Sequence, residues 1–321
     1  MDGVSENRLE WLDAVKGLGI ILVIIGHCDI PGVNRYIYMF HMPLFFIISG
    51  FCWNELKYKG LTITKFLKKK FKAYIIPYLK IALICFFLLG VIGDLLLKGY
   101  NDEYLQQLAK YIVGIFILSK GNTEWLPHCS PIWFLTCLFC AEVFYWVICR
   151  CKHSFILVIL AGISGALFSY NHIQFPWNIH NALTAVPLLY IGSRLKLYLN
   201  EYRSLYIILP LTILAVCVFV FGLKGGDFDG NYFPSFTLMY VQSSIITLAI
   251  FLTFQRYGGG KILSFLGRNT IAIIGYNYLI NAVVQPITGK GTWLMAVVVI
   301  SVCIAFVTAL NKLKTIKKIL I

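Results

Sequence analysis

Predominantly apolar windows recur along the whole chain, each close to the roughly 20 residues that a membrane-spanning helix needs. Their approximate bounds are 12–30, 36–54, 73–97, 131–150, 154–170, 180–197, 204–223, 234–254, 269–287 and 292–312. No internal repeat, low-complexity tract or linker divides them. The pattern predicts an all-α fold, a polytopic transmembrane helical bundle of about ten spans in which residues 1–321 form a single integral-membrane domain.

Residues 98–130 interrupt this pattern between the third and fourth windows. Their stretch 103–119 is typical of an amphipathic helix that lies at the membrane interface. The alternative is an eleventh span, which would invert the orientation of every span that follows it.

The basic residues decide between these two counts. With ten spans and a cytoplasmic N-terminus, 21 of the 28 lysines and arginines fall on the cytoplasmic side, six fall on the other side, and Lys80 lies within a span. The positive-inside rule predicts this asymmetry, and an extra span would scramble it. We therefore expect a multi-pass protein of the cell membrane with both termini in the cytoplasm.

Composition supports a membrane protein. Hydrophobic residues make up 59% of the chain and charged residues 13%, against about 45–50% and about 25% in soluble domains. These values exclude a soluble, disordered or disulfide-scaffold protein, and they make the lipid bilayer a partner. The net charge of +14 then reflects topology, so we expect no nucleic-acid partner.

The densest basic run lies just before the third window. It consists of Lys65, Lys68, Lys69, Lys70 and Lys72. One interpretation is an anchor to anionic lipid headgroups, at about 1 kcal/mol per charge. The other is a cytoplasmic docking site for a polyphosphate ligand, and the two can coexist.

Ionisable residues inside a membrane are functional candidates because burying them is costly. In the first window, Lys16 and His27 are eleven residues apart, which places them within about 20° of one helix face and about 16 Å apart along the axis. Asp13 lies three residues before Lys16 and can pair with it. The alternatives are a snorkelling Lys16 and a structural His27 bonded to a neighbouring helix.

A second histidine, His41, begins the next window on an antiparallel neighbour. His27 and His41 lie a few residues from the same loop, so we expect them at similar depth, within about one helical turn. Converging imidazoles suit a general base and its orienter. A metal site would need further ligands, and no third ligand is evident, so we expect no metal.

Further polar residues lie within the later windows. Glu142, near the middle of its window, indicates either a proton path or a partner for a buried cation. Asn269, Asn277 and Asn281 lie roughly on one face of the ninth window, where amides commonly provide hydrogen bonds between helices.

Together these residues resemble a known family. The segment 11–53 is similar to the N-terminal signature of the membrane-bound acyltransferase family 3, the O-acyltransferases of cell-surface glycans. That signature has an acidic residue, then Arg or Lys, then ten residues, then His; here these are Asp13, Lys16 and His27. The lysine and the run from His41 to Phe46, with Ser49 and Gly50 following, look like the fucose O-acetylase-related subgroup.

Later blocks extend the resemblance over nearly the whole chain. They are the basic loop before Pro77, Ile132-Trp133-Phe134-Leu135 and Leu266-Gly267-Arg268-Asn269-Thr270. One position departs from the family pattern: Asn277 stands where family members often have a histidine. Any contribution of that histidine must here come from an amide or be absent.

The resemblance implies an acetyl group, or a similar short acyl group, that moves from cytoplasmic acyl-CoA to a hydroxyl of a cell-surface or lipid-linked glycan. His27 would be the general base or form an acyl-histidine. His41 would orient the acceptor or assist, and Asp13 would hold Lys16 against the donor. Acetyl-CoA is thus the expected co-substrate. The remaining expected donor contacts are Lys68, Lys69, Lys70 and Lys72, and the expected substrate contacts are Ser49, Trp133, Glu142, Asn269 and Asn277.

Two other classes of function remain open from the sequence. A proton-coupled transporter or flippase also buries charges, but the chain shows no inverted repeat. A structural envelope subunit would give His27 and His41 no reason to converge. The acceptor, the choice of acetyl or succinyl and the oligomeric state stay open, and Asp227–Asn231 and Phe175–Trp177 are candidate acceptor segments.

Overall fold

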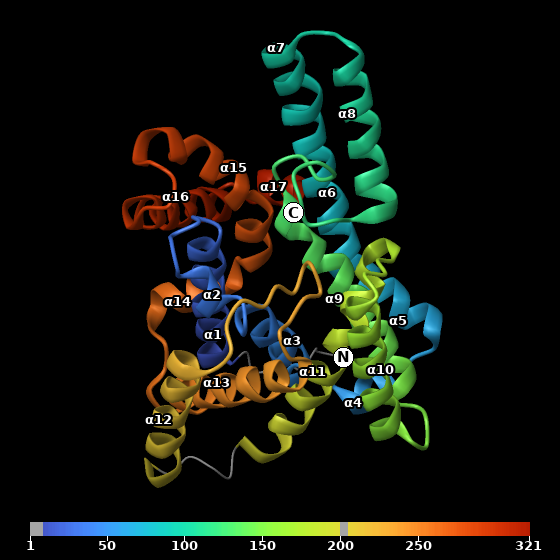
Figure 1. The fold of residues 1–321 in the computed structure, drawn as a ribbon, viewed down its shortest axis with the longest axis vertical. Helices are drawn as coiled ribbons and strands as arrows, with labels where there is room; N and C mark the ends of the chain where they lie inside the picture. The colour runs from blue at the N-terminus through green and yellow to red at the C-terminus, as the bar shows by residue number, and fades with distance from the viewer. Residues whose placement is uncertain (1–8, 200–204) are drawn as a thin grey trace.

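The computed structural model describes residues 9–199 and 205–321. The first half contains α1 (Glu10–Gly26), α2 (Asn34–Ile37), α3 (His41–Phe51), α4 (Glu55–Lys59), α5 (Ile63–Lys70), α6 (Ile76–Cys85), α7 (Asp94–Lys98), α8 (Asp102–Val113) and α9 (Trp133–Ile148). The second half contains α10 (Ser154–Tyr170), α11 (Ile179–Tyr198), α12 (Leu205–Phe221), α13 (Phe236–Tyr257), α14 (Gly260–Arg268), α15 (Thr270–Thr288), α16 (Trp293–Lys312) and α17 (Lys314–Leu320). Figure 1 shows their arrangement.

The predicted all-α class is confirmed for the described residues, and each of the ten windows is largely helical. Five helical stretches are long and apolar enough to cross a membrane, and two shorter apolar helices accompany them. The five are Ile63–Leu96, Ser130–Ile148, Phe236–Tyr257, Thr270–Thr288 and Trp293–Lys312. The count of about ten spans therefore stays a prediction.

The third window is longer than its hydrophobic pattern indicates. Helix begins at Ile63 and continues to Leu96 as one 34-residue stretch, so the whole basic run belongs to the same helix. Wider π-type turns interrupt it at Phe71–Ile75 and Phe86–Gly93. Such turns insert an extra residue and rotate the helix faces that follow.

Residues 103–119 form the predicted amphipathic helix, α8, followed by a π-type turn at Gly114–Leu118. The helix returns beside the end of the third-window helix, and the two project together from one end of the molecule (Figure 1). The hydroxyl of Tyr104 donates to the Val91 carbonyl at 3.1 Å, and that of Tyr111 to Asp94 at 3.4 Å. Tyr104 and Tyr111 are the buried residues of α8, and they form its packed face.

The second window is broken, which its apolar pattern does not show. Helix α2 ends at Ile37 and α3 starts only at His41. Pro43 lies in the first turn of α3, where a missing N–H costs no helical hydrogen bond. The break places His41 at the beginning of a helix, close to the end of α1.

Helices α3 and α11 cross at very short distance because glycine lies at the crossing. A Cβ atom on Gly50 would overlap the backbone carbonyl of Leu189. Backbone atoms cannot move aside like the end of a flexible side chain, so only glycine allows this approach.

We expect Gly50→Ala to destabilise the protein by about 1–3 kcal/mol, the usual cost of overpacking. Gly60→Ala is the matched control, since a Cβ there meets nothing within 4 Å. Thermal unfolding of both variants in the same detergent measures the difference. Equal melting temperatures for the two variants would show that the α3–α11 crossing tolerates a side chain.

Candidate active site

Two cavities lie along α1. The first, called here the basic cavity, has a volume of about 430 Å³, and the charged residues that line it are Lys16, Arg268 and Lys317. The second, called the histidine cavity, has a volume of about 170 Å³ and is lined by both His27 and His41. The structure therefore brings together the two histidines that the sequence places at similar depth.

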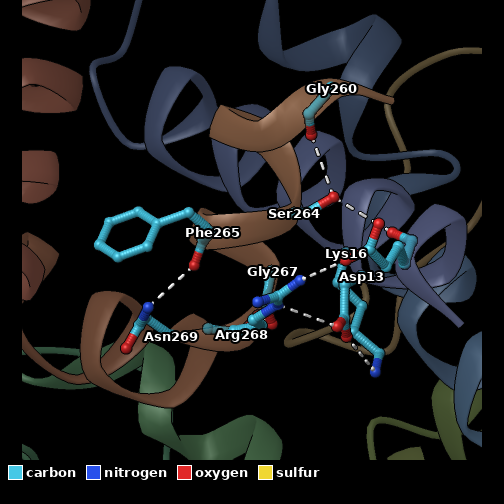
Figure 2. A network of polar contacts seen from close by, with 10 residues as sticks. Asp13, Lys16, Gly260, Ser264, Phe265, Gly267, Arg268 and Asn269 are labelled. Carbon is cyan, nitrogen blue, oxygen red and sulfur yellow. Dashed lines mark hydrogen bonds and ion pairs between the residues drawn. The ribbon is translucent and has the colours of Figure 1, made fainter. Parts of the chain in front are cut away.

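Asp13 anchors two cations at the basic cavity. Its buried carboxylate lies 3.4 Å from Lys16 Nζ and 3.4 Å from Arg268 Nε. Arg268 also pairs with Glu10 at 3.3 Å. Figure 2 shows both cationic side chains converging on Asp13, one from α1 and one from the end of α14. Asp13 thus holds Lys16 as the sequence spacing predicts, and it holds Arg268 as well.

Asn269 and Lys317 form a second polar group on the same wall. Asn269 Oδ1 accepts hydrogen bonds from Lys317 Nζ at 3.1 Å and from Asn311 at 3.2 Å. Its Nδ2 donates to the Phe265 carbonyl at 2.8 Å (Figure 2). Asn269 lines the cavity as a substrate contact should, but its amide is already engaged, so its main visible effect is to hold Lys317.

Lys70 and Glu142 neutralise each other. The ammonium of Lys70 lies 2.5 Å from Glu142 Oε2, and both side chains are buried. The same ammonium lies 4.7 Å from the ring centre of Tyr58 and 5.6 Å from that of Trp53. An ammonium among aromatic faces gains cation–π stabilisation. Of the two alternatives for Glu142, the partner of a buried cation is the one that the structure shows.

The expected donor contacts within the basic run are therefore not brought to the basic cavity. Lys70 is held inside by Glu142, while Lys68, Lys69 and Lys72 are exposed and do not line the cavity. The physical reason is helical geometry: consecutive lysines of one helix point in different directions. The sequence treats this run as one patch, whereas the structure divides it between a buried Lys70 and exposed neighbours.

Ser49 connects this buried pair to the basic cavity. Its hydroxyl donates to Glu142 Oε1 at 2.6 Å, and the hydroxyl of Tyr74 donates to the same oxygen at 3.0 Å. Ser49 and Tyr74 line the cavity, whereas Glu142 does not. Glu142 thus lies behind the wall, where it orients two hydroxyls instead of contacting a substrate directly.

His27 is held by α15. Its Nδ1 lies 3.0 Å from Nδ2 of Asn277, and its backbone carbonyl accepts from Asn281 Nδ2 at 3.2 Å. The ring of Tyr278 meets the imidazole edge-on, 4.9 Å between ring centres. Asn277, expected to contact substrate, is fully buried and contacts His27 instead.

His41 is oriented by its own chain segment. Because a carbonyl only accepts, His41 Nδ1 donates to the Ile37 carbonyl, at 3.0 Å. The ring of Tyr38 lies against the imidazole at 5.1 Å between centres, and the Tyr38 hydroxyl donates to the Gly26 carbonyl at 3.1 Å. The Nε2 atom of His41 is then the acceptor nitrogen of the neutral ring.

Two carboxyl groups from the loop before α13 also line the histidine cavity. Asp227 accepts from the backbone N–H groups of Asp229 at 3.1 Å and Gly230 at 3.2 Å, which fixes the turn. Burial, then the charge of Asp227, raise the pKa of Asp229 to about 7. Asp229 can therefore donate a hydrogen bond near neutral pH. The candidate segment Phe175–Trp177 does not line this cavity.

One aromatic side chain lies where the cavities meet. Phe134 lines both of them, and its neighbour Trp133 lines the histidine cavity. Both belong to the start of α9. Phe134 contacts Phe45 and Phe46 at ring-centre distances of 5.8 Å and 5.1 Å. The aromatic rings of Phe134, Phe45 and Phe46 thus lie between the basic cavity and the histidine cavity.

The sequence did not single out Lys317, Arg268 or Tyr278 as site residues. Nothing in the spacing of Lys317 indicates that its side chain reaches Asn269 and Asn311. In the described part of the chain no group of three or more His, Cys, Asp or Glu residues could hold a metal ion.

A family model described as an acyltransferase domain matches residues 9–312, a range that includes every helix lining the two cavities except α17. No curated protein and no solved structure matches the chain.

We expect Glu142→Leu to destabilise the protein by about 3–5 kcal/mol, because it leaves the Lys70 charge buried without a partner. Adding Lys70→Met should recover most of that loss. The exposed pair Lys110–Glu124 is the control, and Glu124→Gln should change little. Denaturation in detergent measures all three, and a double variant no more stable than Glu142→Leu would contradict the pairing.

Proposed function

The chain belongs to acyltransferase family 3, and from this premise we propose that it is an integral-membrane O-acyltransferase. It moves an acetyl or similar short acyl group from cytoplasmic acyl-CoA to a hydroxyl of a cell-surface or lipid-linked glycan. The observation that carries the proposal is the pair of cavities, one lined by cations and one by two histidines, that meet at Phe134.

The donor binds in the basic cavity. Phosphate groups of the CoA moiety pair with Lys16, Arg268 and Lys317, since charge-assisted bonds to phosphate are among the stronger hydrogen bonds in proteins. The pantetheine arm then follows α1, whose helical rise separates Lys16 from His27 by about 16 Å. This path delivers the thioester to the histidine cavity past Phe134.

The acceptor hydroxyl enters the histidine cavity and attacks the thioester carbonyl carbon. His27 takes the hydroxyl proton, the new C–O ester bond forms, and the C–S bond breaks. The leaving thiolate then takes this proton from His27, which gives free CoA thiol and restores the neutral imidazole. His41 orients the acceptor, and a protonated Asp229 donates to one of its oxygens. An acyl-histidine at His27 is the covalent variant of the same transfer.

Topology follows from the charge asymmetry. Lys16, Arg268 and Lys317 line the basic cavity and belong to the segments that the charge count assigns to the cytoplasm, so the proposal places this cavity toward the cytoplasm, together with both termini. The histidine cavity then faces the outer side, where glycans are assembled.

We expect His27→Gln to lower acyl transfer by 10²–10⁴-fold, the usual contribution of positioned proton transfer, and to leave the protein folded. His153→Gln is the control, because His153 lies outside both cavities. The measurement follows labelled acetyl from acetyl-CoA to glycan in membranes. Near-normal transfer by the His27 variant would exclude the proposed base.

The same assay separates the other candidate functions. A transporter or flippase would transfer no label from acetyl-CoA in the unmodified protein. Label retained on the protein when acceptor is omitted, and lost in His27→Gln, would favour the acyl-histidine route. Mass spectrometry of surface glycans with and without this chain identifies the acceptor.

We expect Lys317→Ala to raise KM for acetyl-CoA about tenfold with little change in kcat, since one hydrogen bond to a charged group contributes about 1.5–3 kcal/mol. Lys318→Ala is the control, because this neighbour is exposed and does not line the cavity. Steady-state kinetics at several acetyl-CoA concentrations measures both KM values. Equal KM values for the two variants would show that Lys317 does not bind the donor.

A further inference from the structure

The two ring nitrogens of His27 have different surroundings. Nδ1 faces Asn277 of α15 at 3.0 Å, and the ring also lines the histidine cavity. A neutral imidazole carries one proton, so the partner of Nδ1 decides whether Nε2 is a donor or a base. The role proposed above requires the proton on Nδ1.

An amide can favour either state. With Nδ2 of Asn277 toward Nδ1, the amide donates, the proton sits on Nε2, and His27 cannot accept a proton from a hydroxyl there. Turning the amide by half a turn exchanges its oxygen and nitrogen without moving the rest of the side chain. Oδ1 then accepts from Nδ1–H, and Nε2 becomes basic.

The first orientation leaves a buried oxygen without a partner. With Nδ2 toward the ring, Oδ1 of Asn277 is fully buried and has no hydrogen-bond partner. A buried polar atom without a partner costs about 1–3 kcal/mol. Turned toward the ring, the oxygen accepts the Nδ1 proton of His27, and Nδ2 takes the buried position that the oxygen leaves. The proposed mechanism needs a basic Nε2, and this need selects the second orientation.

The position of Asn277 next to His27 is fixed independently of this choice. One turn along α15, Asn281 donates through Nδ2 to the His27 backbone carbonyl, and a carbonyl can only accept. Asn281 therefore ties α15 to the end of α1 in one orientation. The ring of Tyr278 packs edge-on against the imidazole of His27.

Resting on the proposed function, we propose that Asn277 is a positioning residue that holds the proton of His27 on Nδ1 and so makes Nε2 the general base. Asn277 acts through His27 and touches neither substrate. It does for His27 what the Ile37 carbonyl does for His41, where Nδ1 is already a fixed donor.

Three variants test this proposal on the full-length protein. Asn277→Asp keeps an acceptor that cannot donate, Asn277→Leu removes both functions at similar volume, and Asn281→Leu removes only the bond to the backbone carbonyl. We expect Asn277→Leu to lower kcat/KM about 100-fold and Asn277→Asp to stay within about tenfold of the unmodified protein. Asn281→Leu reports the loss caused by weaker helix packing alone.

The pH dependence of kcat/KM distinguishes the proposed role of Asn277 from a purely structural one, because a loss of helix packing would not shift it. A carboxylate beside Nδ1 stabilises the imidazolium, so Asn277→Asp should shift the acid limb of kcat/KM to higher pH. Asn281→Leu should leave that limb in place. The other titratable groups that line the cavity with His27 or act on its charge are His41, Asp29, Tyr38, Tyr278, Asp227 and Asp229, and all are unchanged in the three variants.

Nitrogen NMR measures the proton position directly. In protein with ¹⁵N-labelled histidine, protonated and unprotonated ring nitrogens resonate far apart, and His27→Gln identifies the signals of His27. We expect a protonated Nδ1 and an unprotonated Nε2. A proton on Nε2, or an Asn277→Asp variant as inactive as Asn277→Leu, would overturn the proposal.

These outcomes are separate from failure of the proposed function. If His27→Gln abolishes transfer while Asn277→Leu retains it, His27 stays the base and the role of Asn277 is wrong. If His27→Gln retains transfer, the proposed function itself is wrong, whatever the NMR spectrum shows.

Discussion

The contact between α1 and the α14–α15 segment is the constraint on which the candidate site depends. At one end, a Cβ on Gly267 would overlap the backbone carbonyl of Asp13, so α14 reaches the helix backbone and Arg268 reaches the Asp13 carboxylate. At the other end, Asn281 binds the His27 carbonyl. Because α1 is held at both ends, its helical rise sets the separation of Lys16 and His27.

Burying charge in an apolar bundle imposes a second condition. A carboxylate such as Glu142 must be neutralised, because removing an ion from water costs several kcal/mol. Lys70 supplies the opposite charge, and Ser49 and Tyr74 supply hydrogen bonds. This pairing links α5, α3 and α9 behind the basic cavity. Part of the basic run is therefore structural, and the remaining lysines of that run stay at the surface.

Local periodicity was enough to predict several features of the site. The shared face of Asp13, Lys16 and His27, the convergence of His27 and His41, and the family resemblance all follow from spacing within residues 11–53. The pairing of Lys70 with Glu142 did not follow, because it joins residues 72 positions apart in sequence on different helices. Lys317 was missed for the same reason, and the break before His41 was hidden by uniformly apolar neighbours.

The ring of Phe134 gives the two cavities a physical reason to be separate. A thioester that reached a fully open channel would meet water, and hydrolysis would compete with transfer. Phe134 packs against Phe45 and Phe46, so the passage is closed by side chains and not by backbone. Side chains can change rotamer without disturbing α1 or α15, whose positions fix Lys16 and His27. Under the proposed function, a donor arm thus passes while the geometry on both sides of the ring stays intact.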